Sequence, residues 1–145
     1  DLVVVMGNGR IRQAAPPIEI YRRPADAFVA DFIGSTNLLP VETDGGGRAV
    51  VLGHVVPGLA LPAGVTKGLV SIRPEDVQLS QVADSGLPGR VTFVRDLGGT
   101  IETFVDVGGG TTLVAVTTPR QRGDIAAGAE VSVILPAESC VVVQE

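Results

Sequence analysis

The stretch that decides the fold is IETFVDVGGGTTLVAV, residues 101–116. Thr103, Val105 and Val107 stand at alternate positions, which is the period-two pattern of a half-buried β-strand. The three glycines at 108–110 supply the backbone freedom that a tight reversal needs. A second apolar run follows them directly, so the stretch predicts two antiparallel strands joined by a short turn.

Composition extends this β prediction over most of the chain. The 145 residues include 19 glycines and 10 prolines, and 45% are hydrophobic while only 3% are aromatic. This many turn-forming residues argue against a helical bundle and favour short strands around an aliphatic core. From about Leu38 onward the sequence predicts strands at 38–43, 48–52, 59–61, 69–72, 77–79, 90–95, 101–107, 112–116, 130–135 and 140–143. A glycine-rich turn at 44–47 joins the first two of these strands.

The N-terminal residues predict a β-hairpin. Residues 2–6 are consistent with a buried strand, and Gly7-Asn8-Gly9 provides the positive-φ positions of a tight turn before the strand returns at 10–13. The pair Gly7-x-Gly9 also occurs in dinucleotide-binding loops. Here Arg12 stands where such a loop needs a third glycine, and a strand follows instead of a helix, so the hairpin is the better interpretation.

Two short helices are expected next. Pro17 suits the first turn of one helix, and a second is expected to begin at Pro24 and to end at Gly34. The composition changes near residues 35–37. The sequence therefore divides into residues 1–34, a hairpin with helices, and residues 35–145, a β segment.

The β segment contains a weak internal repeat. Residues 63–79 and 127–142 each hold an Ala-Gly pair, a strand, a proline with an acidic turn, and a closing strand. The two prolines are Pro74 and Pro136, and each is expected to stop ladder pairing because proline has no backbone N–H. The repeat predicts two small barrel-like halves.

Charge and residue counts exclude several functions. Sixteen acidic residues against eleven basic ones give a net charge of −5, and Lys67 is the only lysine. This chain lacks the basic and aromatic surface of a nucleic-acid-binding protein. One cysteine and one histidine cannot build a structural zinc site or a disulfide framework. Lys67 also lacks the neighbours of a phosphate-binding loop.

No residue stands out as catalytic. His54 lies beside Gly53 and a Val-Val-Pro run, so a surface or structural role is expected. Cys140 precedes three valines and is expected to be an inert thiol in a strand. We therefore predict no catalytic, metal or cofactor-binding residues.

The strongest candidate positions are Arg73, Glu75 and Asp76, which flank Pro74 at the end of a predicted strand. An arginine there can bind a carboxylate bidentately. Two interpretations stay open: a local structural contact between Arg73 and Glu75, or a site for an anion or a partner protein.

Four strings carry a resemblance to a known family. They are GRI-x-Q at 9–13, P-x-EIY-x-x-P at 17–24, FVA-x-FIG at 28–34 and SIRPEDV at 71–77. Together they resemble the junction between the nucleotide-binding domain and the C-terminal TOBE domain in ATP-binding subunits of ABC importers of the maltose, polyamine and ferric-iron type. The resemblance covers essentially the whole chain. It implies a mainly β fold, an OB-like antiparallel β-barrel with two barrel-like halves, preceded by a short hairpin and two short helices.

The resemblance also implies that the chain contains parts of two domains. Residues 1–34 would be the end of the ATPase domain, and residues 35–145 would be the TOBE domain. The Walker motifs, signature motif and switch histidine of that family would lie ahead of Asp1. This chain alone is therefore expected not to be an enzyme and not to bind ATP tightly. ATP and Mg²⁺ are implied for the longer parent ATPase only.

The family role is regulation and dimerisation in a solute importer. The implied partners are a second copy of the subunit, membrane permease subunits reached through the ATPase domain, and a regulatory protein or small ligand near Arg73, Glu75 and Asp76. An exposed apolar strip at 141–143 is expected to add to the self-contact. The implied location is the cytoplasm, peripheral on the inner face of the cell membrane. The solute stays open, with polyamine or ferric iron slightly favoured.

Two other functions stay open. A small-oxyanion-binding module of the molybdate type would need Lys, Ser and Thr groups to converge, and residues 66–68 and 111–112 are the candidates. The negative net charge disfavours it. An oligonucleotide-binding barrel is compatible with the fold class, but the single lysine and the few aromatic residues oppose it.

Overall fold

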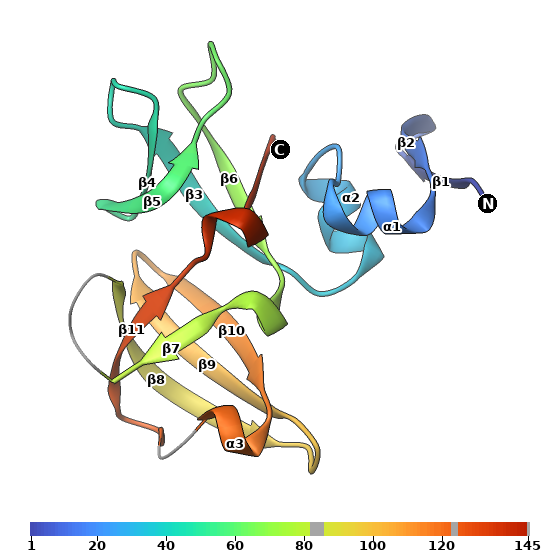
Figure 1. Cartoon of the computed structure of the whole chain (residues 1–145). Coiled ribbons are helices and arrows are strands. Elements are labelled where there is room, and N and C mark those ends of the chain that lie inside the picture. The colour runs from blue at the N-terminus through green and yellow to red at the C-terminus, as the bar shows by residue number, and fades with distance from the viewer. Residues whose placement is uncertain (82–85, 123–124, 145) are drawn as a thin grey trace.

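Two five-stranded antiparallel sheets form the body of the protein, and a hairpin with two helices precedes them (Figure 1). The computed structural model describes residues 1–81, 86–122 and 125–144. Both sheets curl around a shared aliphatic core. The predicted class, a mainly β, OB-like fold with two barrel-like halves, is confirmed.

The first sheet has the strand order β12-β6-β3-β4-β5. Its strands are β3 (Asn37–Thr43), β4 (Arg48–Val51), β5 (His54–Ala60), β6 (Lys67–Ile72) and β12 (Val141–Val143). The second sheet has the order β10-β9-β8-β11-β7. Its strands are β7 (Gln78–Ser80), β8 (Leu87–Asp96), β9 (Ile101–Gly108), β10 (Thr111–Thr117) and β11 (Glu130–Ile134).

The two halves exchange their last strands. After β6 the chain passes through the 3₁₀ turn η1 (Pro74–Asp76), and β7 then pairs with β11 in the other sheet. After β11 it passes through η2 (Ala137–Ser139), and β12 returns to pair with β6. The Pro-acidic turns of the sequence repeat are therefore the two crossovers, and each half is completed by a strand of the other.

The core consists of aliphatic side chains from both sheets. Val105 of β9 lies opposite Leu113 of β10 and Val91 of β8, and all three are at most 1% exposed. From the first sheet, Leu39 and Val70 join the same cluster. The alternating residues of the 101–116 stretch thus face the core, as their spacing predicts.

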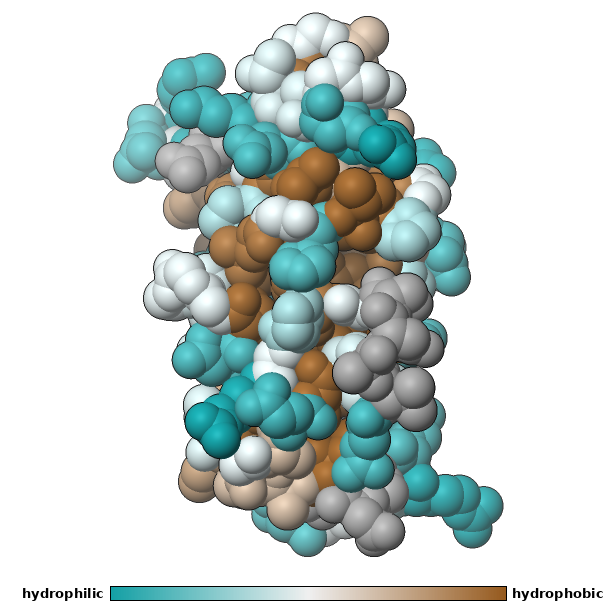
Figure 2. Space-filling view, turned by 90° about the vertical axis from the view of Figure 1, so that its left-hand side faces the viewer, coloured by the Kyte–Doolittle hydropathy of each residue, from teal (hydrophilic) through white to brown (hydrophobic). Residues whose placement is uncertain are grey.

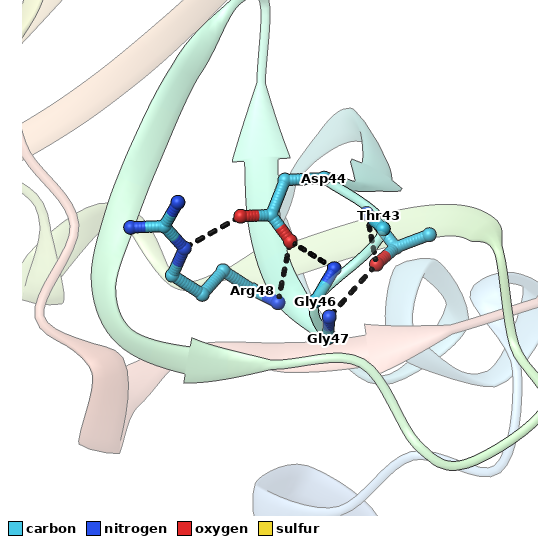
Figure 3. A network of polar contacts seen from close by, with 6 residues as sticks. Thr43, Asp44, Gly46, Gly47 and Arg48 are labelled. Atoms are coloured by element: carbon cyan, nitrogen blue, oxygen red, sulfur yellow. Dashed lines mark hydrogen bonds and ion pairs between the residues drawn. The ribbon is translucent and has the colours of Figure 1, made fainter.

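The predicted turn between β3 and β4 is held by its own side chains (Figure 3). The Asp44 carboxylate accepts hydrogen bonds from the backbone N–H groups of Gly46 at 2.8 Å and Arg48 at 3.1 Å, and it pairs with the Arg48 side chain. The Thr43 hydroxyl oxygen accepts a hydrogen bond from the N–H of Gly47 at 3.2 Å. Asp and Thr favour such turns because their oxygens can replace missing ladder partners.

The N-terminal hairpin pairs β1 (Val3–Gly7) with β2 (Arg10–Ala15). Asn8 and Gly9 have φ values of 53° and 74°, as a two-residue hairpin turn requires. The sequence predicted a buried first strand, and this was wrong for one of its faces. Val5 is buried, whereas Val4 and Met6 are 46% and 58% exposed, because no described segment of the chain covers the other face.

Helices α1 (Pro17–Arg22) and α2 (Ala27–Ile33) follow the hairpin. The predicted start of the second helix at Pro24 was wrong, because Asp26 caps the helix by accepting a hydrogen bond from the Val29 N–H at 2.9 Å. Gly34 does end α2, in an extended conformation with φ of 171°. A short helix α3 (Pro119–Arg122), which the sequence did not predict, follows β10.

Apolar surface remains visible on the side of the molecule that carries β4, β5 and β11, between hydrophilic rims (Figure 2). A cavity of about 110 Å³ lies between the sheets and is lined largely by apolar side chains, among them Val51, Val56, Leu87, Val133 and Leu135. No helix within the described ranges has the length and apolarity that crossing a membrane requires.

Candidate functional site

Arg73 stands directly after β6, at the point where the chain leaves the first sheet for the second. Its side chain turns away from both sheets toward α1 and α2, and the residue is only 6% exposed. A buried arginine must have its donors satisfied, because removing a charge from water is costly. The partners of Arg73 therefore decide what this residue does.

The guanidinium of Arg73 donates only to backbone carbonyls among the described residues. Nη1 donates to the oxygens of Gly34 at 2.8 Å, Ala30 at 3.0 Å and Ser35 at 3.4 Å. Nη2 donates to the Tyr21 oxygen at 3.2 Å. The guanidinium carbon also lies 4.4 Å from the centroid of the Tyr21 ring, which is a cation–π contact.

These carbonyls belong to the C-terminal ends of two helices. The last carbonyls of a helix have no partner within it, and they carry the negative end of the helix dipole. Tyr21 lies in the last turn of α1, and Ala30 and Gly34 lie in the last turn and at the end of α2. One guanidinium thus caps both helices and fastens residues 1–34 to the β segment.

Glu75 and Asp76 are carried by η1, beside Arg73. Among the described residues neither carboxylate forms an ion pair with Arg73. Burial and the neighbouring Glu75 charge raise the pKa of Asp76, while Arg73 partly opposes them. Burial and Glu75 likewise raise the pKa of the Tyr21 hydroxyl. Arg73, Glu75 and Asp76 are therefore close together, with Tyr21 as a fourth member that sequence reasoning missed.

Asn37 is a second residue that sequence reasoning did not single out for this role. Its side-chain amide donates to the Val114 oxygen at 2.9 Å and accepts from the Val114 N–H at 2.8 Å. The residue is 7% exposed and joins β3 of the first sheet to β10 of the second. The only sequence signal for this contact between the sheets was an asparagine at the start of an apolar strand.

The other candidate positions are not brought together. His54 is exposed, and its Nδ1 lies 3.0 Å from the Leu52 oxygen. Cys140 is half-buried, and burial, followed by the charges of Glu138 and Asp76, raises its thiol pKa to about 11. Lys67 lies on β6 of the first sheet, whereas Thr111 and Thr112 lie on β10 of the second.

No group of three His, Cys, Asp or Glu side chains within the described ranges is placed to hold a metal ion. The strip at 141–143 also differs from its prediction. It forms β12, which pairs with β6, and Val143 is 2% exposed, so it is not the exposed apolar strip that was expected.

The model of the TOBE domain family matches residues 70–143, which is half of the chain and runs from β6 through both crossovers to β12. The chain belongs to the TOBE domain family. Arg73 lies within the matched residues, and its hydrogen-bond partners at residues 21, 30, 34 and 35 lie ahead of them.

Several curated relatives of this TOBE chain are import ATP-binding proteins. The Fe(3+) ions import ATP-binding protein of Rhizobium etli is 35% identical over 79% of the chain and 33% of its own length. The spermidine/putrescine import ATP-binding protein of Ruegeria pomeroyi is 35% identical over the whole chain and 42% of its own length. The sulfate/thiosulfate import ATP-binding protein of Chromobacterium violaceum is 51% identical over 66% of the chain and 29% of its own length. The chain thus spans well under half of these relatives.

Among the solved structures that share the fold of the TOBE chain is the cytoplasmic molybdate-binding protein ModG, with a TM-score of 0.57 and 17% sequence identity. The match covers 75% of this chain and 96% of that protein. At this identity the likeness shows the fold alone.

Proposed function

We propose that this chain is the C-terminal part of the ATP-binding subunit of an ABC-type importer. Residues 1–34 then end the ATPase domain, and residues 35–145 form its regulatory TOBE domain. The relatives support this assignment, because all three named above are import ATP-binding proteins that align with this chain over a third or so of their own length. They take different solutes, so the solute stays open.

The observation that carries the proposal is the Arg73 contact with the ends of α1 and α2. A domain that restrains or stabilises a moving ATPase domain must be fastened to it firmly. Arg73 supplies four hydrogen bonds and a ring contact at that boundary. A movement of the last helices of the ATPase domain would therefore be transmitted directly to the TOBE domain.

A second observation supports the same assignment. The hairpin and helices expose large apolar side chains in a number that a small independent unit rarely shows. These side chains are Leu2, Val4, Met6, Ile11, Ile18, Phe28 and Phe32, with exposures from 40% to 66%. We infer that this surface packs against the rest of the ATPase domain. That domain would bind ATP and Mg²⁺ and contact the permease subunits at the inner face of the membrane.

Dimerisation through the TOBE domain is part of the proposal. The strip at 141–143 is largely paired with β6, so we do not expect it to form the dimer contact. We infer that the contact is formed instead by the solvent-exposed side of the β8–β9 hairpin, where Phe93 and Leu97 are 54% and 56% exposed. Light scattering on the chain tests this. We expect a dimer that Phe93→Asp weakens and that Ile18→Asp leaves unchanged; a monomer at high concentration would count against self-sufficient dimerisation.

The function itself is tested in the protein's own cells. The gene product is isolated from membranes, and its intact mass, ATPase activity and co-purifying permease are measured. We expect a mass well above the 14.9 kDa of this chain, and ATPase activity that responds to the co-purifying permease less in Arg73→Ala than in the parent and equally in the exposed Arg90→Ala. A product without ATPase activity and without a permease would refute the proposal.

The oxyanion alternative is separated by a thermal-shift panel with molybdate, tungstate, sulfate and phosphate. The placement of Lys67 and Thr112 on different sheets does not favour it. A large shift with molybdate alone would make it the better interpretation.

A further inference from the structure

A cavity of about 400 Å³ lies where η1 and η2 approach the β9–β10 hairpin. Its volume falls in the range of small-molecule sites. Glu75 and Asp76 of η1 and Glu138 of η2 stand among its lining residues, and no lysine or arginine does among the residues that the structure describes. The cavity is thus formed at the crossovers between the two halves, and the charged groups described on its wall are acidic.

Two hydroxyl groups on the wall of this cavity have no hydrogen-bond partner among the residues that the structure describes. They are Oγ1 of Thr103 on β9 and Oγ1 of Thr117 on β10. Thr103 lies opposite Ala115, and Thr117 lies opposite Ile101, so both threonines point to the same face of the hairpin. Thr103 is fully buried. Leaving a buried hydroxyl unpaired costs about 1–3 kcal/mol, so two together on one wall indicate missing partners.

The carboxylates also lack a directly paired cation among the described residues. None of Glu75, Asp76 and Glu138 forms an ion pair within the described ranges. Burial and then the neighbouring Glu75 raise the pKa of Asp76, and Arg73 opposes them only in part, so the charged carboxylate is not fully compensated. These carboxylates do not form a group that could hold a metal ion. Their placement on two separate turns suits a ligand of several atoms.

We propose that this cavity binds a small organic cation with N–H donors, of the alkylammonium or guanidinium class. The carboxylates of η1 and η2 balance its charge at the mouth of the cavity. The oxygens of Thr103 and Thr117 accept hydrogen bonds from its N–H groups. Val77, Val116 and Ile125 supply apolar walls for the carbon atoms of the ligand.

Binding requires a small local movement. The oxygens of Thr103 and Thr117 are both below the surface, so η1 has to move slightly away from β10, against which it packs. Because η1 directly follows Arg73, the ligand also acts next to the residue that fastens α1 and α2. Ligand binding in this cavity is therefore expected to depend on how residues 1–34 contact the β segment.

Calorimetric titration of the chain tests the proposal with methylguanidinium and butylammonium chlorides. Tetramethylammonium chloride serves as a cation without N–H donors. We expect one saturable site for at least one of the two donors and no saturable binding of tetramethylammonium. NMR amide shifts are expected in η1 and β10.

Variants distinguish this cavity from general attraction to an acidic protein. Thr103→Val removes the hydroxyl at nearly constant volume, and Asp76→Asn removes a charge. Each is expected to weaken binding about tenfold, the loss of one hydrogen bond to a charged group. Glu130→Gln, on an exposed position of β11, is the matched control and is expected to bind like the parent.

Three results would overturn the proposal. The first is no saturable binding of either donor cation, and the second is equal binding of tetramethylammonium. The third is a Thr103→Val variant that binds like the parent. If Thr103→Val does not fold, Thr117→Val provides the same test, because it removes the second hydroxyl from the same wall of the cavity.

Discussion

The guanidinium of Arg73 lies over the ring of Tyr21 and also donates a hydrogen bond to the carbonyl oxygen of the same residue, at 3.2 Å. One planar group thus binds both the side chain and the backbone of the last turn of α1. Its other donors reach the end of α2. Only an arginine has a flat, forked donor set that can do this.

Arg73→Lys is therefore expected to be disruptive although it keeps the charge. An ammonium group can neither reach all four carbonyls nor stack on Tyr21. We expect the free energy of unfolding to fall by about 2–3 kcal/mol, because buried acceptors lose charged donors. Urea unfolding measures the change, and hydrogen exchange at α1 and α2 is expected to accelerate most.

Arg90→Lys, on an exposed position of β8, is the control and is expected to change stability by less than about 0.5 kcal/mol. Equal stability of Arg73→Lys and the parent would contradict the role of Arg73 as a fastening between the two segments.

Gly89 tests how closely β8 and β9 pack. A methyl group added there would lie 2.5 Å from Cγ1 of Val105 and 3.3 Å from the Asp106 oxygen. Val105 is fully buried and stiff, so it has little room to yield. We expect Gly89→Ala to cost about 1–3 kcal/mol of stability by overpacking.

Gly99→Ala is the matched control, because an added methyl group there meets nothing within 4 Å. Thermal unfolding of both variants is compared with the parent. A melting temperature of Gly89→Ala equal to that of Gly99→Ala would show that the sheet tolerates the extra volume.

The strands were predictable because their pattern is local. Alternation at 101–116 and the glycine turns at 44–47 and 108–110 set strand and reversal positions without reference to distant residues. The exchange of β7 and β12 between the sheets was not visible, because both strands have three residues and carry no register signal of their own. The repeat with Pro74 and Pro136 indicated where the chain leaves each sheet, but not which strand β7 or β12 pairs with next.

The site was predictable only in part, for a related reason. Arg73, Glu75 and Asp76 were selected because they cluster in sequence after a strand. The partners of Arg73 are backbone oxygens at residues 21, 30, 34 and 35, and any sequence supplies such groups. The absence of a partner for the hydroxyls of Thr103 and Thr117 among the described residues depends on packing across the sheets. Threonine in a strand is too ordinary to signal this.

Asp26 should make stability depend on pH in the acidic range. Burial alone would raise its pKa, but hydrogen bonds from the Val29 N–H and from Arg12 outweigh burial, so the pKa lies below its usual 3.8. A lowered pKa gives stability that is present above 3.8 and is lost as the pH falls through the lower folded value. We expect the parent to exceed Asp26→Asn in stability at pH 7, with this difference shrinking toward pH 2.

Denaturant titrations at several pH values measure this difference. Asp26→Asn keeps an oxygen that can cap α2, so the comparison isolates the charge. Asp31→Asn, which replaces an exposed aspartate on the same helix, is the control for the substitution itself. A gap between the parent and Asp26→Asn that grows on acidification would contradict the sign.

Cys140 should resist thiol reagents while the protein is folded. Burial, with the charges of Glu138 and Asp76, raises its thiol pKa to about 11, and only the thiolate reacts. At pH 8 the thiolate fraction is then about a hundredfold lower than for a thiol with a pKa of 9. We expect modification by a disulfide reagent to be slower by at least that factor in buffer than in urea. Glutathione under both conditions corrects for the solvent, and native labelling as fast as in urea would show that Cys140 is accessible and ionised in the folded protein.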